Sequence, residues 1–322
     1  MSFESVKALV DDDLRQVDVV IRNRLASDVV LVNQIAEYIV GSGGKRLRPL
    51  LVVVCAKACG YRGNRHPEAA AIIEFIHTAT LLHDDVVDGS TLRRGRDTAN
   101  EVWGNEASVL VGDYVYSRAF EMMVSLESMR IMDVMAGATN KIAEGEVLQL
   151  LNANDPDTTE ERYFEVIYRK TAKLFEAGAQ VAAIVSGAPA QIEGAMAAYG
   201  RHLGTAFQLV DDVLDYQSNS EELGKNLGDD LAEGKPTLPL IYALRNGDDE
   251  QRALIRRSIE EGSVEQLNLI TAAIESTGGL AYTARLARRE AALAIEAISI
   301  LPDSAYKQAL RELADFAVER TY

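Results

Sequence analysis

The sequence predicts an all-α fold, one large helical bundle, and three observations lead to this prediction. Apolar residues recur at helical spacing almost from end to end, and no stretch alternates with the period of two that is typical of strands. The composition is rich in Ala, Leu, Val and Glu, and only 6% of the residues are aromatic, which favours helices. The prolines all lie where an expected helix begins or ends: Pro49, Pro67, Pro156, Pro189, Pro236, Pro239 and Pro302.

The expected helices follow one another through short connections that contain polar residues, glycine or proline. In the N-terminal half they cover residues 3–25, 29–40, 46–59, 67–88, 106–126 and 128–152. Two long helices over 159–187 and 189–217 are apolar nearly all round in places, which is typical of the centre of a bundle. Shorter helices over 237–246, 249–260, 263–277, 279–300 and 303–320 complete the chain. Because no linker divides this series, we expect a single domain over residues 1–322.

The charge and the cysteines exclude several classes of function. The formal net charge of −16 is the opposite of the basic surface that nucleic-acid binding requires, so we expect no nucleic-acid partner. We expect no membrane span, since no apolar run approaches about 18 residues, and no signal peptide at the N-terminus. Cys55 and Cys59 are expected to be reduced thiols rather than metal ligands. Together these features predict a cytoplasmic protein.

One pentapeptide pattern, Asp-Asp-x-x-Asp, occurs twice in the chain. On a helix its first and last carboxylates are four residues apart and share a face. Such carboxylates cannot all stay ionised cheaply without a cation, and Mg²⁺ is commonly held by one or two carboxylates plus substrate phosphates. Two solvated acidic helix ends are the alternative, but each copy follows an apolar run. The sequence therefore predicts a Mg²⁺–diphosphate site with the candidate ligands Asp84, Asp85, Asp88, Asp211, Asp212 and Asp215.

Basic residues near the motifs are candidates for diphosphate contacts. Arg93 and Arg94 follow the first motif, and guanidinium groups bind phosphate in a bidentate manner. Lys45 and Arg48 lie at the start of an expected helix after two glycines, where a helix N-terminus binds anions. His77 lies two turns before the first motif on the same helical face. A surface charge cluster and a core histidine are the structural alternatives.

Two further segments carry donors for a polyanion. Lys170 and Thr171 interrupt an otherwise apolar and acidic helix, and Lys225 and Lys235 lie in a glycine-rich loop over 224–235. A loop of this kind can close over a diphosphate, whereas an exposed charged loop would not need three glycines.

With these motifs in this order, the chain resembles the trans-isoprenyl diphosphate synthases over essentially its whole length. The likeness covers residues 43–49, 84–95, 170–171, 207–215 and 234–239. It implies the isoprenoid synthase bundle with a large central cavity, usually as a homodimer. It also implies a prenyltransferase that condenses isopentenyl diphosphate onto an allylic diphosphate such as farnesyl diphosphate. Three Mg²⁺ ions per active site, for which Mn²⁺ can substitute, would assist ionisation.

The resemblance assigns a role to each matching residue. Lys45, Arg48, His77 and Arg94 would bind the diphosphate of isopentenyl diphosphate. Asp84, Asp88, Asp211 and Asp215 would coordinate Mg²⁺ on the allylic diphosphate, with Asp85 and Asp212 in support. Arg93, Lys170, Lys225 and Lys235 would contact that same diphosphate, and Thr171 and Gln208 would line the reacting carbons.

The length of the product is predicted from the helix that carries the first motif. Ala79 and Thr80, just before Asp84, are small and leave room for a growing chain, whereas short-chain relatives tend to have aromatic residues there. From Asp84 to Ile73 the helix descends roughly 16 Å, which suits a product of about eight isoprene units within a range of about six to ten. Such a product would serve as a quinone side chain, for example of ubiquinone. Ile76, Met123 and Met135 are candidates for the tunnel lining or floor, although buried Met is more often core packing.

Four other classes share part of the pattern. A terpene cyclase would not need Lys45, Arg48 and His77, and a head-to-head coupling enzyme would lack the lysine loop. A ferritin-like di-iron bundle requires two Glu-x-x-His pairs, and only Glu74–His77 fits. A non-enzymatic helical scaffold would bind diphosphate without turnover.

Overall fold

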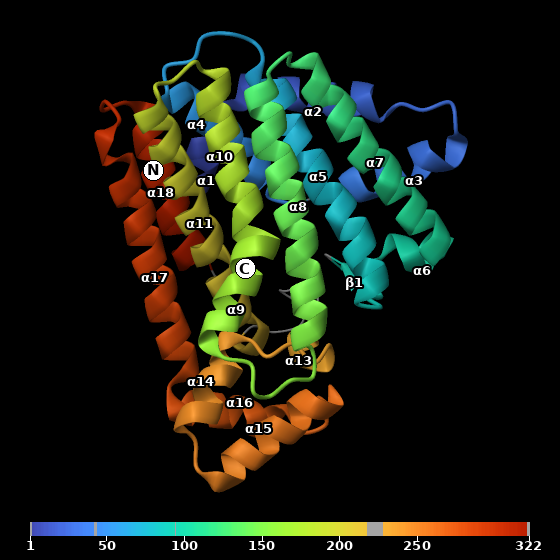
Figure 1. The fold of residues 1–322 in the computed structure, drawn as a ribbon, viewed down its shortest axis with the longest axis vertical. Helices are drawn as coiled ribbons and strands as arrows, with labels where there is room; N and C mark the ends of the chain where they lie inside the picture. Colours follow the sequence, from blue (N-terminus) through green and yellow to red (C-terminus); the bar gives the residue numbers. More distant parts are fainter. Residues whose placement is uncertain (1, 42–43, 94, 218–227, 321–322) are drawn as a thin grey trace. The chain divides into compact units, whose positions relative to one another are not determined.

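The computed structural model describes residues 2–41, 44–93, 95–217 and 228–320, and in this part of the chain the prediction of an all-α fold is confirmed (Figure 1). The chain divides into two compact units. Unit 1 consists of Met1–Thr139, Leu174–Gly200 and Ala297–Leu313, and unit 2 of Asn140–Lys173, Arg201–Glu296 and Ala314–Tyr322. The single domain expected over residues 1–322 stays a prediction.

Unit 1 is organised around one long helix. It begins with α1 (Phe3–Leu9), α2 (Asp11–Leu25), α3 (Val30–Gly41), α4 (Leu47–Ala58), α5 (His66–Val87), α6 (Ala99–Trp103) and α7 (Asn105–Ser125). α5 packs against α2, α4 and α7, and Figure 1 shows α7 beside it. Its core residues include Ile76, Ala79 and Leu82, which are fully buried. This packing fixes the C-terminal end of α5, where the first acidic motif lies.

Three details of unit 1 differ from the sequence prediction. The helix expected over 3–25 is broken at Val10, because the Val10 N–H bonds to the Lys7 carbonyl oxygen at 3.1 Å, three residues back. The prediction of no strand is wrong over a few residues, since β1 (Leu92–Arg93) pairs antiparallel with β2 (Arg96–Asp97). Gly95, with φ of 72°, permits the tight turn between them. The short α6 was also not expected.

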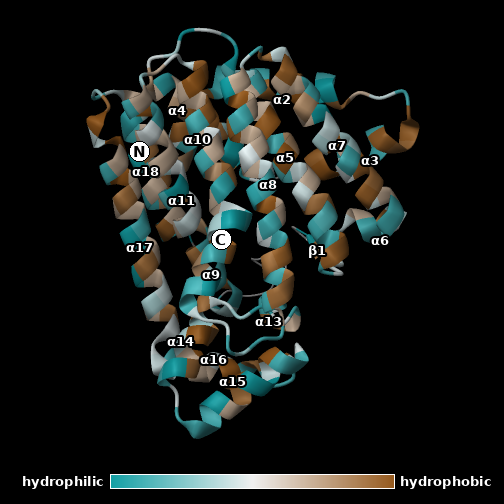
Figure 2. Cartoon of the chain, viewed as in Figure 1, coloured by the Kyte–Doolittle hydropathy of each residue, from teal (hydrophilic) through white to brown (hydrophobic). Residues whose placement is uncertain are grey.

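Unit 2 surrounds the second acidic motif. α8 (Met129–Asn152), α10 (Lys173–Val185), α11 (Ala190–Gln217), α17 (Gly279–Ala297) and α18 (Ala305–Glu319) contribute residues to both units, and η2 (Ile298–Ile300) belongs to unit 1. Unit 2 also contains α9 (Glu160–Ile167), η1 (Tyr168–Ala172), α13 (Asp229–Ala232), α14 (Leu238–Asn246), α15 (Asp249–Glu261) and α16 (Leu267–Thr277). Figure 2 shows hydrophobic and hydrophilic residues on each long helix, as expected for amphipathic helices.

The apolar faces of unit 2 form two clusters. One is built on α14, α15 and α16 and includes Val213 and Tyr216 of α11. The other joins Tyr163 and Ile167 of α9 to Leu209 of α11. Both clusters therefore hold the turn of α11 that carries the second acidic motif. The short α13 was not expected from the sequence.

One local irregularity matters for function. The helix expected over 159–187 contains a π-helix, η1, and both Lys170 and Thr171 lie in it. Gly145 of α8 permits the close approach of this segment. A Cβ at position 145 would lie only 2.8 Å from the main-chain nitrogen of Lys170, which is too close for any residue with a side chain. π-helical turns are rare and frequently occur at functional sites.

In the described part of the chain, every helix is too short or too polar to cross a bilayer.

Candidate functional site

The first acidic motif ends helix α5 in unit 1. Asp84 and Asp85 belong to its last turn, and Asp88 caps it, with its N–H donating to the Asp84 carbonyl oxygen at 2.8 Å. The Asp85 side chain is fully buried, and its Oδ1 accepts two hydrogen bonds from Arg93, from Nε at 2.8 Å and from Nη2 at 2.5 Å. The middle carboxylate of the motif is thus held by a guanidinium eight residues further on.

The chemistry of this helix end fits a hard divalent cation. Oδ2 of Asp85 is buried without a hydrogen-bond partner among the described residues. Asp84 and Asp88 are half-buried on either side of it in sequence. Among the described residues no three His, Cys, Asp or Glu side chains come together as a self-sufficient metal site. Mg²⁺ does not need one, because it usually combines one or two carboxylates with phosphate oxygens and water.

Two members of the predicted basic set meet in unit 1. Nη1 of Arg48, in the first turns of α4, lies 2.9 Å from Nε2 of His77 on α5. The Arg48 guanidinium also stacks over the Phe175 ring, with its central carbon 4.6 Å from the ring centroid. Lys45 is exposed just before α4.

Two of the predicted site residues, Arg94 and Lys225, lie outside the described residues.

The second acidic motif lies in α11, and its middle carboxylate is also buried. Asp212 is 1% exposed, and its two oxygens accept hydrogen bonds from the Tyr163 hydroxyl and from Nε2 of Gln208, the latter at 2.9 Å. Oε1 of Gln208 accepts from the Thr171 hydroxyl at 2.9 Å. A continuous hydrogen-bonded chain therefore joins η1, α11 and α9.

Two titratable groups in this hydrogen-bonded series, Asp212 and Tyr163, have raised pKa values. Burial, reinforced by the nearby Asp230 carboxylate, raises the pKa of Asp212 to about 8, although the hydrogen bonds from Tyr163 and Gln208 act in the opposite direction. Burial also raises the pKa of Tyr163 well above its ordinary value, so its hydroxyl stays a donor. Unlike Asp85, Asp212 has neutral donors on its two oxygens.

The predicted lysines of unit 2 are brought together by helix α8. Nζ of Lys170 pairs with Glu146 at 2.6 Å, and Lys235 pairs with Glu233. With its amide oxygen turned toward the two ammonium groups, Gln149 accepts from Lys235 at 3.2 Å and from Lys170 at 3.3 Å. Gln149 thereby links two cations that the sequence places 65 positions apart (235 − 170).

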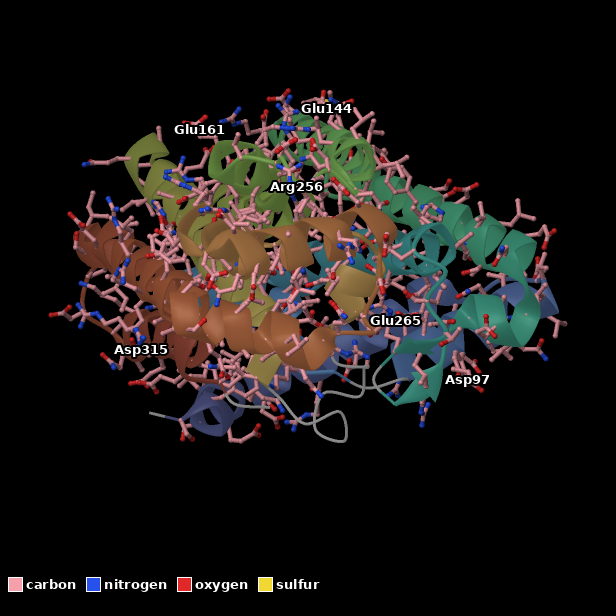
Figure 3. The ribbon with its side chains drawn as sticks, turned by 90° about the horizontal axis from the view of Figure 1, so that it is seen from below. Asp97, Glu144, Glu161, Arg256, Glu265 and Asp315 are labelled. Carbon is pink, nitrogen blue, oxygen red and sulfur yellow. The ribbon has the colours of Figure 1, made fainter. Side chains whose placement is uncertain are left out.

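The π-helix that presents Lys170 is itself anchored. Arg169 bonds to Glu144 of α8, which is labelled in Figure 3, and donates to Glu165 of α9 at 2.6 Å. These contacts hold η1 to α8 at the point where Gly145 permits close approach.

Sequence reasoning missed four supporting residues: Tyr163, Glu146, Gln149 and Arg320. Arg320 lies beyond α18, and its Nη2 is 2.7 Å from Oδ1 of Asp211. None of the four lies in a motif, and each contacts a residue that is distant in the sequence. The available signal for the contact between α8 and η1 was Gly145, because a glycine within a helix often marks a close contact.

The predicted chain-length residues all lie in unit 1. Ile76, Ala79, Met123 and Met135 are fully buried. Thr80 is half-buried, and its hydroxyl donates to the His77 carbonyl oxygen at 2.9 Å. Burial agrees with a tunnel lining and with core packing alike, so their role stays a prediction.

Comparison with known proteins identifies relatives of this chain. The chain is 54% identical over 321 residues to the octaprenyl diphosphate synthase of Escherichia coli, covering 99% of both chains. It is equally similar, 54% over 323 residues, to that of Haemophilus influenzae, covering 100% of this chain and 98% of the other. The crystal structure of a Caulobacter crescentus polyprenyl synthase complexed with calcium and isoprenyl diphosphate superimposes with a TM-score of 0.96 at 43% identity, covering 99% of this chain and 98% of that one.

A decaprenyl diphosphate synthase from Rhodobacter capsulatus gives a TM-score of 0.93 at 44% identity, covering 98% of each chain. The family described as polyprenyl synthetase matches residues 29–276. The chain therefore belongs to the polyprenyl synthetase family.

Proposed function

We propose that this protein condenses isopentenyl diphosphate onto an allylic diphosphate, with farnesyl diphosphate as primer, and extends it to about eight isoprene units. It is a long-chain trans-prenyltransferase, given its family and its full-length likeness to octaprenyl diphosphate synthases. The observation that carries the proposal is the pair of acidic motifs, each at a defined helical position with its middle carboxylate buried and hydrogen-bonded.

Divalent cations would be held by Asp84 and Asp88 in unit 1 and by Asp211 and Asp215 in unit 2. When bound, they stabilise the negative charge of the allylic diphosphate as it leaves. Asp85 and Asp212 would orient their neighbours, since each is buried and fixed by hydrogen bonds. The donor set is all oxygen, which suits Mg²⁺ and also Mn²⁺.

The chain's own cations would bind and orient the two substrates. Lys170 and Lys235, linked through Gln149, would donate to the departing diphosphate. Arg93, which pairs with Asp85, would contact the same diphosphate. Lys225 is assigned to the same diphosphate from the sequence alone. Preorganised donors of this kind stabilise charge that develops in the transition state.

Arg48 and His77, in contact with each other, would bind the diphosphate of isopentenyl diphosphate together with Lys45 and Arg94. The Thr171 hydroxyl and the Gln208 amide would lie beside the reacting carbons, where their dipoles stabilise the allylic cation. The proton lost after condensation would leave with the released diphosphate, since no side-chain base is assigned to it.

We further propose a cytoplasmic homodimer whose product becomes the side chain of a quinone such as ubiquinone. An exposed apolar stripe on α8 supports the dimer, because Val147, Leu150 and Leu151 are 58%, 66% and 68% exposed. Their spacing places them on one helical face. Exposed apolar patches of this kind often mark protein–protein contacts.

The test is an incubation with labelled isopentenyl diphosphate, farnesyl diphosphate and Mg²⁺, followed by chromatographic sizing of the product. We expect incorporation of label into a linear polyprenyl diphosphate of about eight units, abolished by EDTA, as expected for a metal-assisted ionisation. A cyclised hydrocarbon without incorporated label would indicate a cyclase. Diphosphate binding with no product would indicate a scaffold.

A further inference from the structure

The C-terminal end of the described chain places one buried arginine against the second acidic motif. The Arg320 side chain is 4% exposed, and its Nη2 lies 2.7 Å from Oδ1 of Asp211. The same Nη2 donates to the Phe207 carbonyl oxygen at 2.5 Å, and Nε donates to the Ala317 carbonyl oxygen at 3.2 Å. The central guanidinium carbon lies 3.6 Å from the centroid of the Phe207 ring.

These contacts leave the guanidinium little freedom to move. Two main-chain carbonyls and an aromatic face fix its plane, so Arg320 is rigid with respect to α11 and α18. Because this fixed guanidinium lies 2.7 Å from Oδ1 of Asp211, it restricts the orientations that the carboxylate can adopt. The orientation of Asp211 is therefore set from outside its own helix.

The two side chains of this ion pair differ in exposure. The Asp211 side chain is 32% exposed, whereas the Arg320 side chain is 4% exposed. Arg320 is therefore a buried partner of a carboxylate that keeps part of its side-chain surface in contact with solvent.

The acidic residues of this motif lie close together. Asp211, Asp212 and Asp215 lie within five residues of one helix. Asp212 is hydrogen-bonded by the neutral Tyr163 and Gln208, whereas Asp211 is in contact with the cation Arg320. A buried ion pair contributes little net stability on its own, because desolvation offsets the attraction. Its value here is in orienting Asp211.

We propose that Arg320 is a positioning residue for the second acidic motif, which fixes the orientation of Asp211 as a ligand that would hold a divalent cation. This inference rests on the proposed function, because it takes Asp211 as a metal ligand. Partners of this kind typically change metal affinity by about 10- to 100-fold when they are removed.

The experiment measures Mn²⁺ binding by the full chain in the presence of inorganic diphosphate, with free Mn²⁺ followed by electron paramagnetic resonance. We expect Arg320→Ala to weaken Mn²⁺ binding about 10- to 100-fold. Arg320→Lys should recover part of the loss, because a point charge attracts Asp211 but has no second nitrogen that donates to the Ala317 carbonyl oxygen as Nε does. The matched control is Arg245→Ala, which removes an arginine of the same unit that is 68% exposed and pairs with Glu160, and it should bind as the wild type does.

A double-mutant comparison separates positioning from simple structural support. If Arg320 acts through Asp211, the variant carrying both Arg320→Ala and Asp211→Asn should bind Mn²⁺ no more weakly than Asp211→Asn alone. Additive losses would overturn the proposal. So would an Arg320→Ala protein that has a lower unfolding temperature but binds Mn²⁺ normally, since Arg320 would then only anchor the end of the chain.

Two further outcomes remain distinguishable. If Asp211→Asn itself leaves Mn²⁺ binding unchanged, the metal role of Asp211 in the proposed function fails, whatever Arg320 does. If Arg320→Ala does not fold, Arg320→Gln takes its place, because it keeps donors for the main-chain carbonyls without the charge. A folded Arg320→Gln protein with wild-type Mn²⁺ binding would overturn the proposal.

Discussion

In the first acidic motif the buried middle carboxylate, Asp85, is paired with a guanidinium, whereas in the second the corresponding Asp212 is held by the neutral Tyr163 and Gln208. The first motif has its counter-charge within the next eight residues. In the second, burial raises the pKa of Asp212 to about 8, and the cation Arg320 contacts the neighbouring Asp211 instead. Identical pentapeptide patterns thus have different electrostatic surroundings, and the difference arises from residues outside the pattern.

The largest expected effect is on turnover, and it concerns the first aspartate of each motif, Asp84 and Asp211. Asp84→Ala and Asp211→Ala should each reduce turnover by several orders of magnitude while the helical content is unchanged, because each removes a proposed ligand for the diphosphate-bound cation. Turnover is measured at saturating Mg²⁺ and helicity by circular dichroism. Asp249→Asn, at a carboxylate that is 97% exposed on α15, is the control. Near-wild-type turnover in either alanine variant would refute the metal assignment.

The counter-charge of the first motif gives the largest expected effect on stability. Arg93→Ala should lower the free energy of unfolding by about 3 kcal/mol, because it leaves the buried Asp85 carboxylate without its cation. Urea unfolding measures the change. Arg256→Ala, which removes a surface pair with Asp157 (Figure 3 labels Arg256), should change little. If both variants lost a similar small amount of unfolding free energy, the Arg93–Asp85 pair would contribute no more to stability than a surface ion pair does.

The second motif should respond to pH in the opposite sense from an ordinary ion-paired carboxylate. Because the pKa of Asp212 is raised from 3.8 to about 8, the folded protein binds this proton more tightly than the unfolded chain does. Stability should therefore fall as the pH rises from about 4 to about 8 in metal-free buffer. Asp212→Asn, which carries no titrating group, should unfold at a higher temperature than the wild type at pH 7, and the difference should vanish near pH 4.

Thermal unfolding in EDTA measures this difference. Asp85→Asn is the matched variant in the first motif, and it should not be stabilising at pH 7, because it leaves Arg93 without its carboxylate. If the two asparagine variants behaved alike, the electrostatic contrast between the motifs would be wrong.

The smallest expected effect concerns a single neutral donor. Tyr163→Phe should cost about 1 kcal/mol of unfolding free energy, since it removes one hydrogen bond to the buried Asp212. Tyr282→Phe is the control, because its hydroxyl donates to Glu160 from a half-buried position at 2.7 Å. A loss at Tyr163 no greater than that at Tyr282 would show that burial of Asp212 adds nothing to this hydrogen bond.

The sequence was sufficient where function depends on local spacing. The positions of both motifs on helices followed from their apolar approach runs, and the pairing of Arg48 with His77 agrees with their expected common role. Arg93 could be connected to the first motif because it lies only eight residues after Asp85.

The sequence was insufficient where the fold joins distant segments. Arg320 and Asp211 are 109 positions apart (320 − 211), and Tyr163 and Asp212 are 49 positions apart, so no spacing rule connects them. The π-helix at 168–172 has no turn or proline signal in the sequence, and its close contact with α8 at Gly145 is made only in the folded chain. The lysines at 170 and 235 were each found as cations, but the Gln149 that links them was not.

The most direct test of the central claim, that both motifs bind metal despite their different surroundings, is the number of Mn²⁺ ions bound with a thio analogue of farnesyl diphosphate that does not ionise. We expect the variant with Asp84→Ala and Asp88→Ala, and separately the variant with Asp211→Ala, each to bind fewer Mn²⁺ ions than the wild type but still some. An unchanged number in either variant would contradict the claim for that motif.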